Sequence, residues 1–137
     1  MSDANLITNL TDVACGYVPS SRPAKPNELA AMKRFLLSYG VSPQNIDALI
    51  KTGLSGKRPR PTFNAQMAEL RAAFSYDERV ILMRHLYRLM FDIDGQDARL
   101  TQYTHFLGTF LGVREPQMAA LRDEAARGLT PRAGATG

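Results

Sequence analysis

An acidic turn is the part of this sequence whose residue types could do chemistry. The stretch Asp92-Ile93-Asp94-Gly95-Gln96-Asp97 holds three carboxylates and a side-chain amide. Oxygen ligands of this kind are preferred by Ca²⁺ and Mg²⁺. The calcium-loop pattern fails, however, because alignment from Asp92 puts Asp97 where Gly is required and Tyr103 where Glu is required. We therefore expect Asp92 and Asp94 to end one helix and cap the next, with weak divalent-metal binding as the alternative.

A basic, Pro-rich segment lies at 53–61, and its cations are Lys57, Arg58 and Arg60. Such a segment can contact nucleic-acid phosphates without reading the base sequence. The residues before this segment have a spacing similar to that of a helix-turn-helix. The recognition helix of such a motif would, however, contain Pro59 and Pro61. Proline inside a helix costs about 3 kcal/mol or more. A solvated loop is therefore the favoured interpretation of 57–60, and nucleic-acid binding is the alternative.

The histidines and the cysteine give little support to catalysis. Neither His85 nor His105 has a carboxylate three or four positions away, so neither has a helical partner for metal binding or proton transfer. His85 is expected on the polar side of its helix with Arg84 and Arg88, which could contact an acidic partner or nucleic acid. Cys15 is the one cysteine and suits a small apolar position. With no familiar catalytic motif either, we predict no enzyme activity and no cofactor.

The acidic turn is preceded by the most apolar helix of the sequence. Ser75-Tyr76-Asp77-Glu78 is a capping box, in which a hydroxyl and a carboxylate each satisfy one backbone N–H. Two apolar ridges follow at helical spacing: Val80, Met83, Tyr87 and Met90, and Leu82, Leu86, Leu89 and Ile93. An apolar face this wide predicts a helix at the centre of the core.

The other segments also have helical spacing, and none alternates as a strand would. We expect helices at 5–14, from 27 to a stop at Gly40, from Ser42-Pro43 to a stop at Gly53, at 62–74, after the acidic turn to a stop at Gly112, and at 116–127 before a stop at Gly128. The predicted fold is all-α, a compact bundle of six or seven helices.

Composition agrees with a globular helical domain. The 137 residues are 45% hydrophobic, and the net charge of +4 favours acidic partners without requiring nucleic acid. No apolar run approaches the roughly 20 residues of a membrane span, and no secretory signal is visible. We expect a cytoplasmic protein with a short helix and Pro-rich loop at 1–26, a helical domain at 27–128 and a flexible tail at 129–137.

The second half of the chain resembles tellurite-resistance TerB-like helical domains. The similarity lies in the Glu78-Arg79-Val80 helix start, the Asp94-Gly95 turn and the helix that ends at Leu111-Gly112-Val113. In the first half, Tyr39-Gly40-Val41-Ser42 is similar to the family's helix stop. The resemblance implies a small helical bundle with a metal site proposed at its acidic turn. Arg99-Leu100-Thr101 stands where the family places glutamates, which implies that most of the metal chemistry is missing.

These observations favour a non-catalytic domain that acts by binding another protein. The resemblance adds a TerB-like adaptor role connected with stress response. Nucleic-acid binding through 57–60 and weak divalent-metal binding remain the alternatives.

Overall fold

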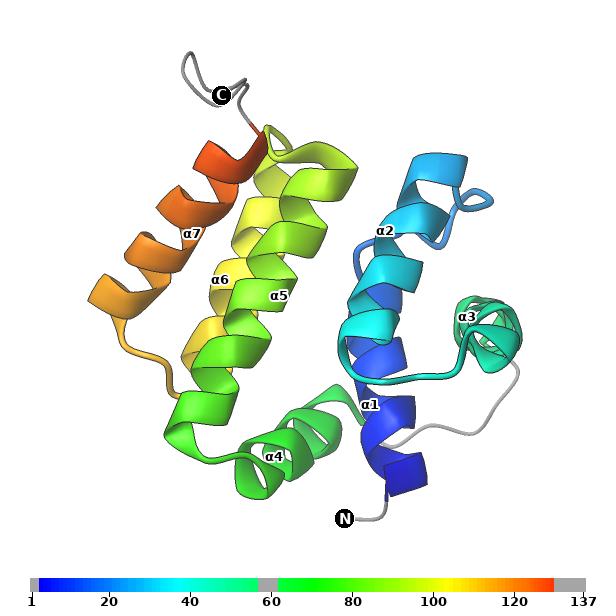
Figure 1. The fold of residues 1–137 in the computed structure, drawn as a ribbon, viewed down its shortest axis with the longest axis horizontal. Coiled ribbons are helices and arrows are strands. Elements are labelled where there is room, and N and C mark those ends of the chain that lie inside the picture. The colour runs from blue at the N-terminus through cyan, green and yellow to red at the C-terminus, as the bar shows by residue number, and fades with distance from the viewer. Residues whose placement is uncertain (1–2, 57–61, 130–137) are drawn as a thin grey trace.

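A computed structural model describes residues 3–56 and 62–129, which form seven α-helices and no strand (Figure 1). The helices are α1 (Asp3–Cys15), α2 (Pro26–Ser38), α3 (Pro43–Ser55), α4 (Phe63–Ala73), α5 (Tyr76–Asp94), α6 (Ala98–Phe110) and α7 (Glu115–Leu129). The prediction of an all-α bundle is confirmed. None of the helices in these two ranges has both the length and the apolar character of a membrane span.

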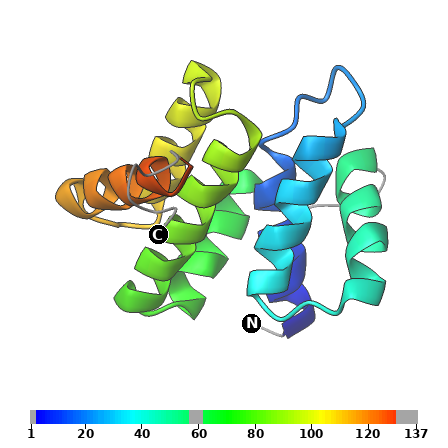
Figure 2. The same cartoon turned by 45° about the horizontal axis from the view of Figure 1, so that its top comes forward.

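Helix α5 lies in the middle of the bundle. It packs against α2 on one side and against α6 and α7 on the other. Helices α5 and α7 run side by side in the same direction, and α6 runs the opposite way behind them (Figure 1). Figure 2 shows α2 between α5 and α3, while α1 packs against α2, α3 and α4.

The expected start and core face of α5 are both present. The Ser75 hydroxyl accepts a hydrogen bond from the Glu78 N–H at 3.2 Å, and the Glu78 carboxylate accepts one from the Ser75 N–H at 2.9 Å. Six residues of the two ridges are buried: Leu82, Met83, Leu86, Tyr87, Leu89 and Met90. This confirms that α5 is the central core helix.

Glycine ends two helices as predicted but lies inside a third. Gly40 and Gly112 follow α2 and α6 with φ of 78° and 74°, the left-handed conformation that favours glycine. The predicted stop at Gly53 is wrong, because α3 continues to Ser55 and Gly56 takes the left-handed position with φ of 67°. A Cβ on Gly53 would lie 2.8 Å from the Cys15 sulfur. Gly53 is therefore required for close contact between α1 and α3.

The segment before α2 contributes to the same core as the rest of the bundle. Leu10 and Tyr17 are fully buried, and the Tyr17 hydroxyl lies 2.7 Å from the Thr104 hydroxyl of α6. Burial raises the pKa of Tyr17 well above its usual value. At the start of α2, the Arg22 guanidinium binds both carboxylate oxygens of Glu28 at 2.9 and 2.8 Å and lowers the pKa of that carboxyl.

Two of the sequence predictions fall wholly or largely outside the described residues. The basic residues Lys57, Arg58 and Arg60 lie in the gap between 56 and 62. The predicted tail at 129–137 lies outside as well, except for Leu129, which belongs to α7.

Replacement of Leu86 by alanine should destabilise the protein by about 2–5 kcal/mol, because Leu86 is fully buried and its loss leaves a cavity. Chemical denaturation would measure the change. Ile81→Ala is the matched control on the same helix, since Ile81 is 44% exposed and should cost much less. Equal losses for the two variants would contradict the assigned core face of α5.

The contact between α1 and α3 leads to a second prediction about stability. Alanine normally stabilises a helix interior by about 1 kcal/mol relative to glycine. Gly53→Ala should instead destabilise the protein by about 1–3 kcal/mol, because its Cβ would overlap the Cys15 sulfur. In a Cys15→Ala background the same change should cost little or become favourable. Identical effects of Gly53→Ala in the two backgrounds, measured by denaturation, would rule out this contact as the cause.

Candidate functional site

The acidic turn between α5 and α6 is built differently from the sequence prediction. The Asp97 carboxylate accepts hydrogen bonds from the N–H groups of Arg99 and Leu100 at 2.7 and 3.3 Å, so Asp97 is the N-cap of α6. The Asp94 carboxylate accepts one from the Gln96 N–H at 3.1 Å within the turn. The prediction that Asp92 and Asp94 cap the next helix is therefore wrong. The capping residue, Asp97, lies three positions after Asp94.

Asp92 instead joins two helices. Its carboxylate oxygens lie 3.3 Å from the Arg88 Nε of α5 and 3.3 Å from an Arg34 guanidinium nitrogen of α2. The Asp92 side chain is only 9% exposed, so this pairing occurs at the edge of the core. Among the described residues, no group of three or more His, Cys, Asp and Glu side chains is placed to hold a metal ion. A cation at Asp92 would have to displace two guanidinium groups.

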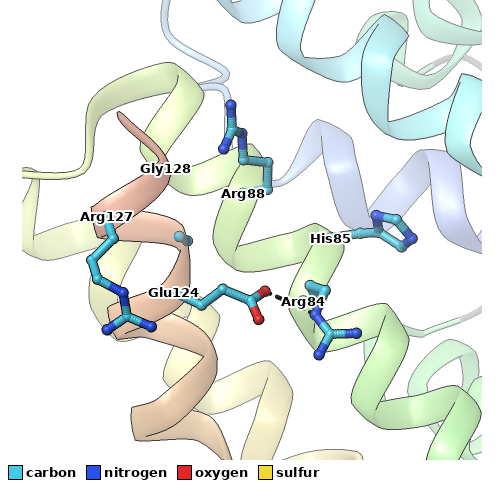
Figure 3. Close-up of a pocket in the computed structure, with 7 residues that line it drawn as sticks. Arg84, His85, Arg88, Glu124, Arg127 and Gly128 are labelled. Carbon is cyan, nitrogen blue, oxygen red and sulfur yellow. Dashed lines mark hydrogen bonds and ion pairs between the residues drawn. The ribbon is translucent and has the colours of Figure 1, made fainter. Parts of the chain in front are cut away.

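A cleft of about 540 Å³ lies between α5 and α7 (Figure 3). Its lining residues are Arg84, His85 and Arg88 from α5, and Glu124, Ala125, Arg127 and Gly128 from α7. Three guanidinium groups accompany one carboxylate, which leaves two positive charges in excess when His85 is neutral. We call this feature the arginine cleft.

The arginines of the cleft differ in how they are paired. Arg84 Nε lies 2.8 Å from a Glu124 carboxylate oxygen, and both side chains are about half exposed. Arg88 is paired with Asp92, whereas Arg127 has no ion pair or hydrogen bond of its side chain within 3–56 and 62–129. A guanidinium carries five donors that match the planar oxygens of carboxylate and phosphate. The cleft can therefore bind anionic groups.

His85 contributes an apolar wall more than a charge. The ring projects from the side of α5 that faces α2 (Figure 3) and lies 5.3 Å from the Tyr39 ring in an edge-on contact. Burial, and secondarily the nearby Arg84, lower the pKa of His85, which favours the neutral ring. His85 is thus half-buried, although the sequence placed it on the polar side of its helix.

His105 has a partner that helical spacing could not reveal. Its Nε2 lies 3.2 Å from a Glu115 carboxylate oxygen at the exposed start of α7. The two residues are ten positions apart and lie on different helices. This pair lies on the surface of the bundle, where both side chains are more than half exposed.

The C-terminal turn of α7 lies directly against Arg88. A Cβ on Gly128 would lie 2.6 Å from the nearest Arg88 guanidinium nitrogen. The predicted helix stop at Gly128 is wrong, because α7 continues to Leu129 and Gly128 remains helical. The small residue allows α7 to approach the Arg88 side chain at the end of the cleft.

Of the basic residues predicted to contact nucleic acid or an acidic partner, the structure places only two in one site. Arg84 and Arg88 line the arginine cleft as neighbours one helical turn apart, whereas Lys57, Arg58 and Arg60 lie outside the described residues. Sequence reasoning missed Arg34, Glu124 and Arg127. These residues come from other helices, and the spacing of Arg84 and Arg88 was the single signal that pointed to this face.

Comparison with protein-family models, curated proteins and solved structures found no match to this chain. The resemblance to TerB-like domains therefore stays a prediction.

We expect no calcium or magnesium binding tighter than about millimolar at the acidic turn, a range typical of weak calcium sites. Thermal melts with and without each cation test this, because a ligand at about a hundred times its Kd adds about 2.7 kcal/mol of stability. The melting temperature should not change in millimolar cation. A clear rise that Asp94→Asn abolishes would show a working metal site.

Proposed function

We propose that this protein is a non-catalytic binding domain whose arginine cleft binds an acidic segment of another protein. The observation that carries the proposal is the excess of guanidinium groups in a cleft open to solvent between α5 and α7. Arg127 is exposed and its guanidinium donors are unused within the described residues. Arginine is favoured in protein interfaces because its planar donors bind carboxylates in pairs.

The carboxylates near the arginines favour a protein partner over nucleic acid. Glu124 lies within the cleft and Asp92 lies beside Arg88. Each strand of a nucleic-acid duplex carries one phosphate per about 3.4 Å of helix axis, so this dense negative charge would lie close to both carboxylates. Separate Asp or Glu side chains of a protein can instead bind single guanidinium groups and avoid the acidic ones.

The surroundings of the histidines support binding rather than catalysis. His85 packs against Tyr39 beside a positively charged arginine, and His105 pairs with Glu115 on the exposed surface. Neither arrangement combines a nucleophile with a base and a third group that orients it, which covalent catalysis requires. No cofactor is part of the proposal.

The cellular setting is part of the same proposal. A single cysteine in a compact helical domain is typical of cytoplasmic proteins, whose thiols stay reduced. A TerB-like adaptor role in a stress response is supported by the sequence resemblance alone. Weak divalent-metal binding at Asp92 and Asp94 is the least favoured candidate, because two arginines already pair with Asp92.

Affinity capture from a native lysate, treated with nuclease, would test the proposed binding. Baits would be the wild type, an Arg84→Gln/Arg127→Gln variant and a Lys51→Gln/Arg122→Gln control. The control removes the same charge from exposed positions outside the cleft. We expect a protein that the wild type and the control recover equally and that the cleft variant recovers in lower yield, because this variant lacks two ion pairs of about 0.2–1 kcal/mol each.

Two results would contradict the proposal. One is a recovered protein whose yield does not depend on Arg84 and Arg127. The other is recovery of nucleic acid alone from an untreated lysate, with the steep salt dependence of phosphate contacts. That second result would favour the alternative function through Lys57, Arg58 and Arg60.

A further inference from the structure

A second, smaller hollow lies on the other side of α5. It has a volume of about 190 Å³ and lies between α2 and α5. Its polar lining consists of Arg34, Ser38, His85, Arg88 and Asp92. His85 and Arg88 also line the arginine cleft, so the two hollows meet at these residues on the exposed strip of α5.

We infer that the two hollows form one groove across α5, and that this groove takes an extended acidic protein segment with carboxylates on both sides of the helix. The inference rests on the proposed function and specifies the shape and charge spacing of the partner. It adds Arg34 of α2 to the binding surface.

The α2 side of the groove presents exposed guanidinium groups to which the carboxylates of such a partner can bind. The Arg34 side chain is 58% exposed and the Arg88 side chain is 51% exposed, although both contact Asp92. Each is held by one carboxylate oxygen at 3.3 Å, so most of its five donors stay available. Asp92 therefore fixes the positions of the two guanidinium groups without saturating them.

The Arg88 side chain is the bridge between the two hollows. Gly128 of α7 lies against its guanidinium group, and the Asp92 carboxylate pairs with its Nε at 3.3 Å. In Figure 3, Arg88 and His85 project from α5 away from Arg84 and Glu124. A bound chain that passes over α5 would meet Arg127 and Arg84 first, then Arg88, and then Arg34.

The width of α5 sets the spacing of the partner's acidic residues. A helix with its side chains is about 10 Å across. An extended chain advances about 3.3 Å per residue. Acidic residues about three positions apart would therefore reach both hollows, whereas adjacent acidic residues would reach one hollow at a time.

Synthetic Gly/Ser peptides with two glutamates each would test this spacing. In one peptide the glutamates are about three positions apart, matching the expected span of α5; in the other, of equal composition, they are adjacent. NMR titration of the full chain at low salt would give both dissociation constants. We expect the spaced peptide to bind several-fold more tightly and to shift signals on α2, α5 and α7 together.

Single variants would show whether both sides of α5 take part. Arg34→Gln and Arg127→Gln should each weaken the spaced peptide by roughly two- to fivefold, the range for one exposed ion pair. Lys33→Gln is the control for Arg34, because Lys33 is its neighbour on α2 but pairs with Asp47 of α3 at 2.8 Å. Arg122→Gln is the control for Arg127 on α7. Neither control should change the affinity by a comparable factor.

The outcomes separate this inference from the proposed function. If the peptides bind with equal affinity, and Arg127→Gln weakens them while Arg34→Gln does not, the arginine cleft binds acidic segments but the groove across α5 is wrong. If Lys33→Gln has the same effect as Arg34→Gln, general electrostatic attraction explains the binding and the inference is also wrong. If neither peptide binds, the proposed function fails together with the inference.

Discussion

Helix α5 has to bury two apolar ridges at once, and the positions of its neighbours follow from that requirement. Leu82 and Leu86 are fully buried, and so are Met83 and Met90 on the other ridge. An apolar face of this width cannot be covered by one helix. Helices α2, α6 and α7 therefore pack around α5, and α1, α3 and α4 complete the core from the side of α2 and α6.

The same requirement determines where polar chemistry can occur. Packing on several sides leaves α5 a narrow exposed strip, on which Arg84 and Arg88 lie one turn apart with His85 at its edge. Long arginine side chains suit such a strip, because their stems cover apolar surface while their guanidinium groups stay in water. The candidate site is thus the part of the central helix that its neighbours leave exposed.

Local signals allowed much of the fold to be predicted from the sequence. The capping box at Ser75 and Glu78 and the glycines after α2 and α6 depend on residues within one helical turn, and all are present. Gly53 and Gly128 were misread because the same residue type serves close packing as well as helix termination. Their partners, Cys15 and Arg88, lie on other helices and are distant in the sequence. Only tertiary contact distinguishes these two uses of glycine.

The difference between local signals and tertiary contacts also explains why the acidic turn and the arginine cleft were not fully predicted from the sequence. Local composition left weak metal binding at Asp92 as an alternative, but Arg34, 58 residues earlier in the chain, occupies one of the Asp92 oxygens. A carboxylate at the edge of a core is stabilised by paired cations, and two guanidinium groups satisfy this one. The pairing also keeps Arg34 and Arg88 together at the junction of the two hollows. The partner that we propose has separated carboxylates, because Asp92 and Glu124 stay within the positive surface and repel dense negative charge.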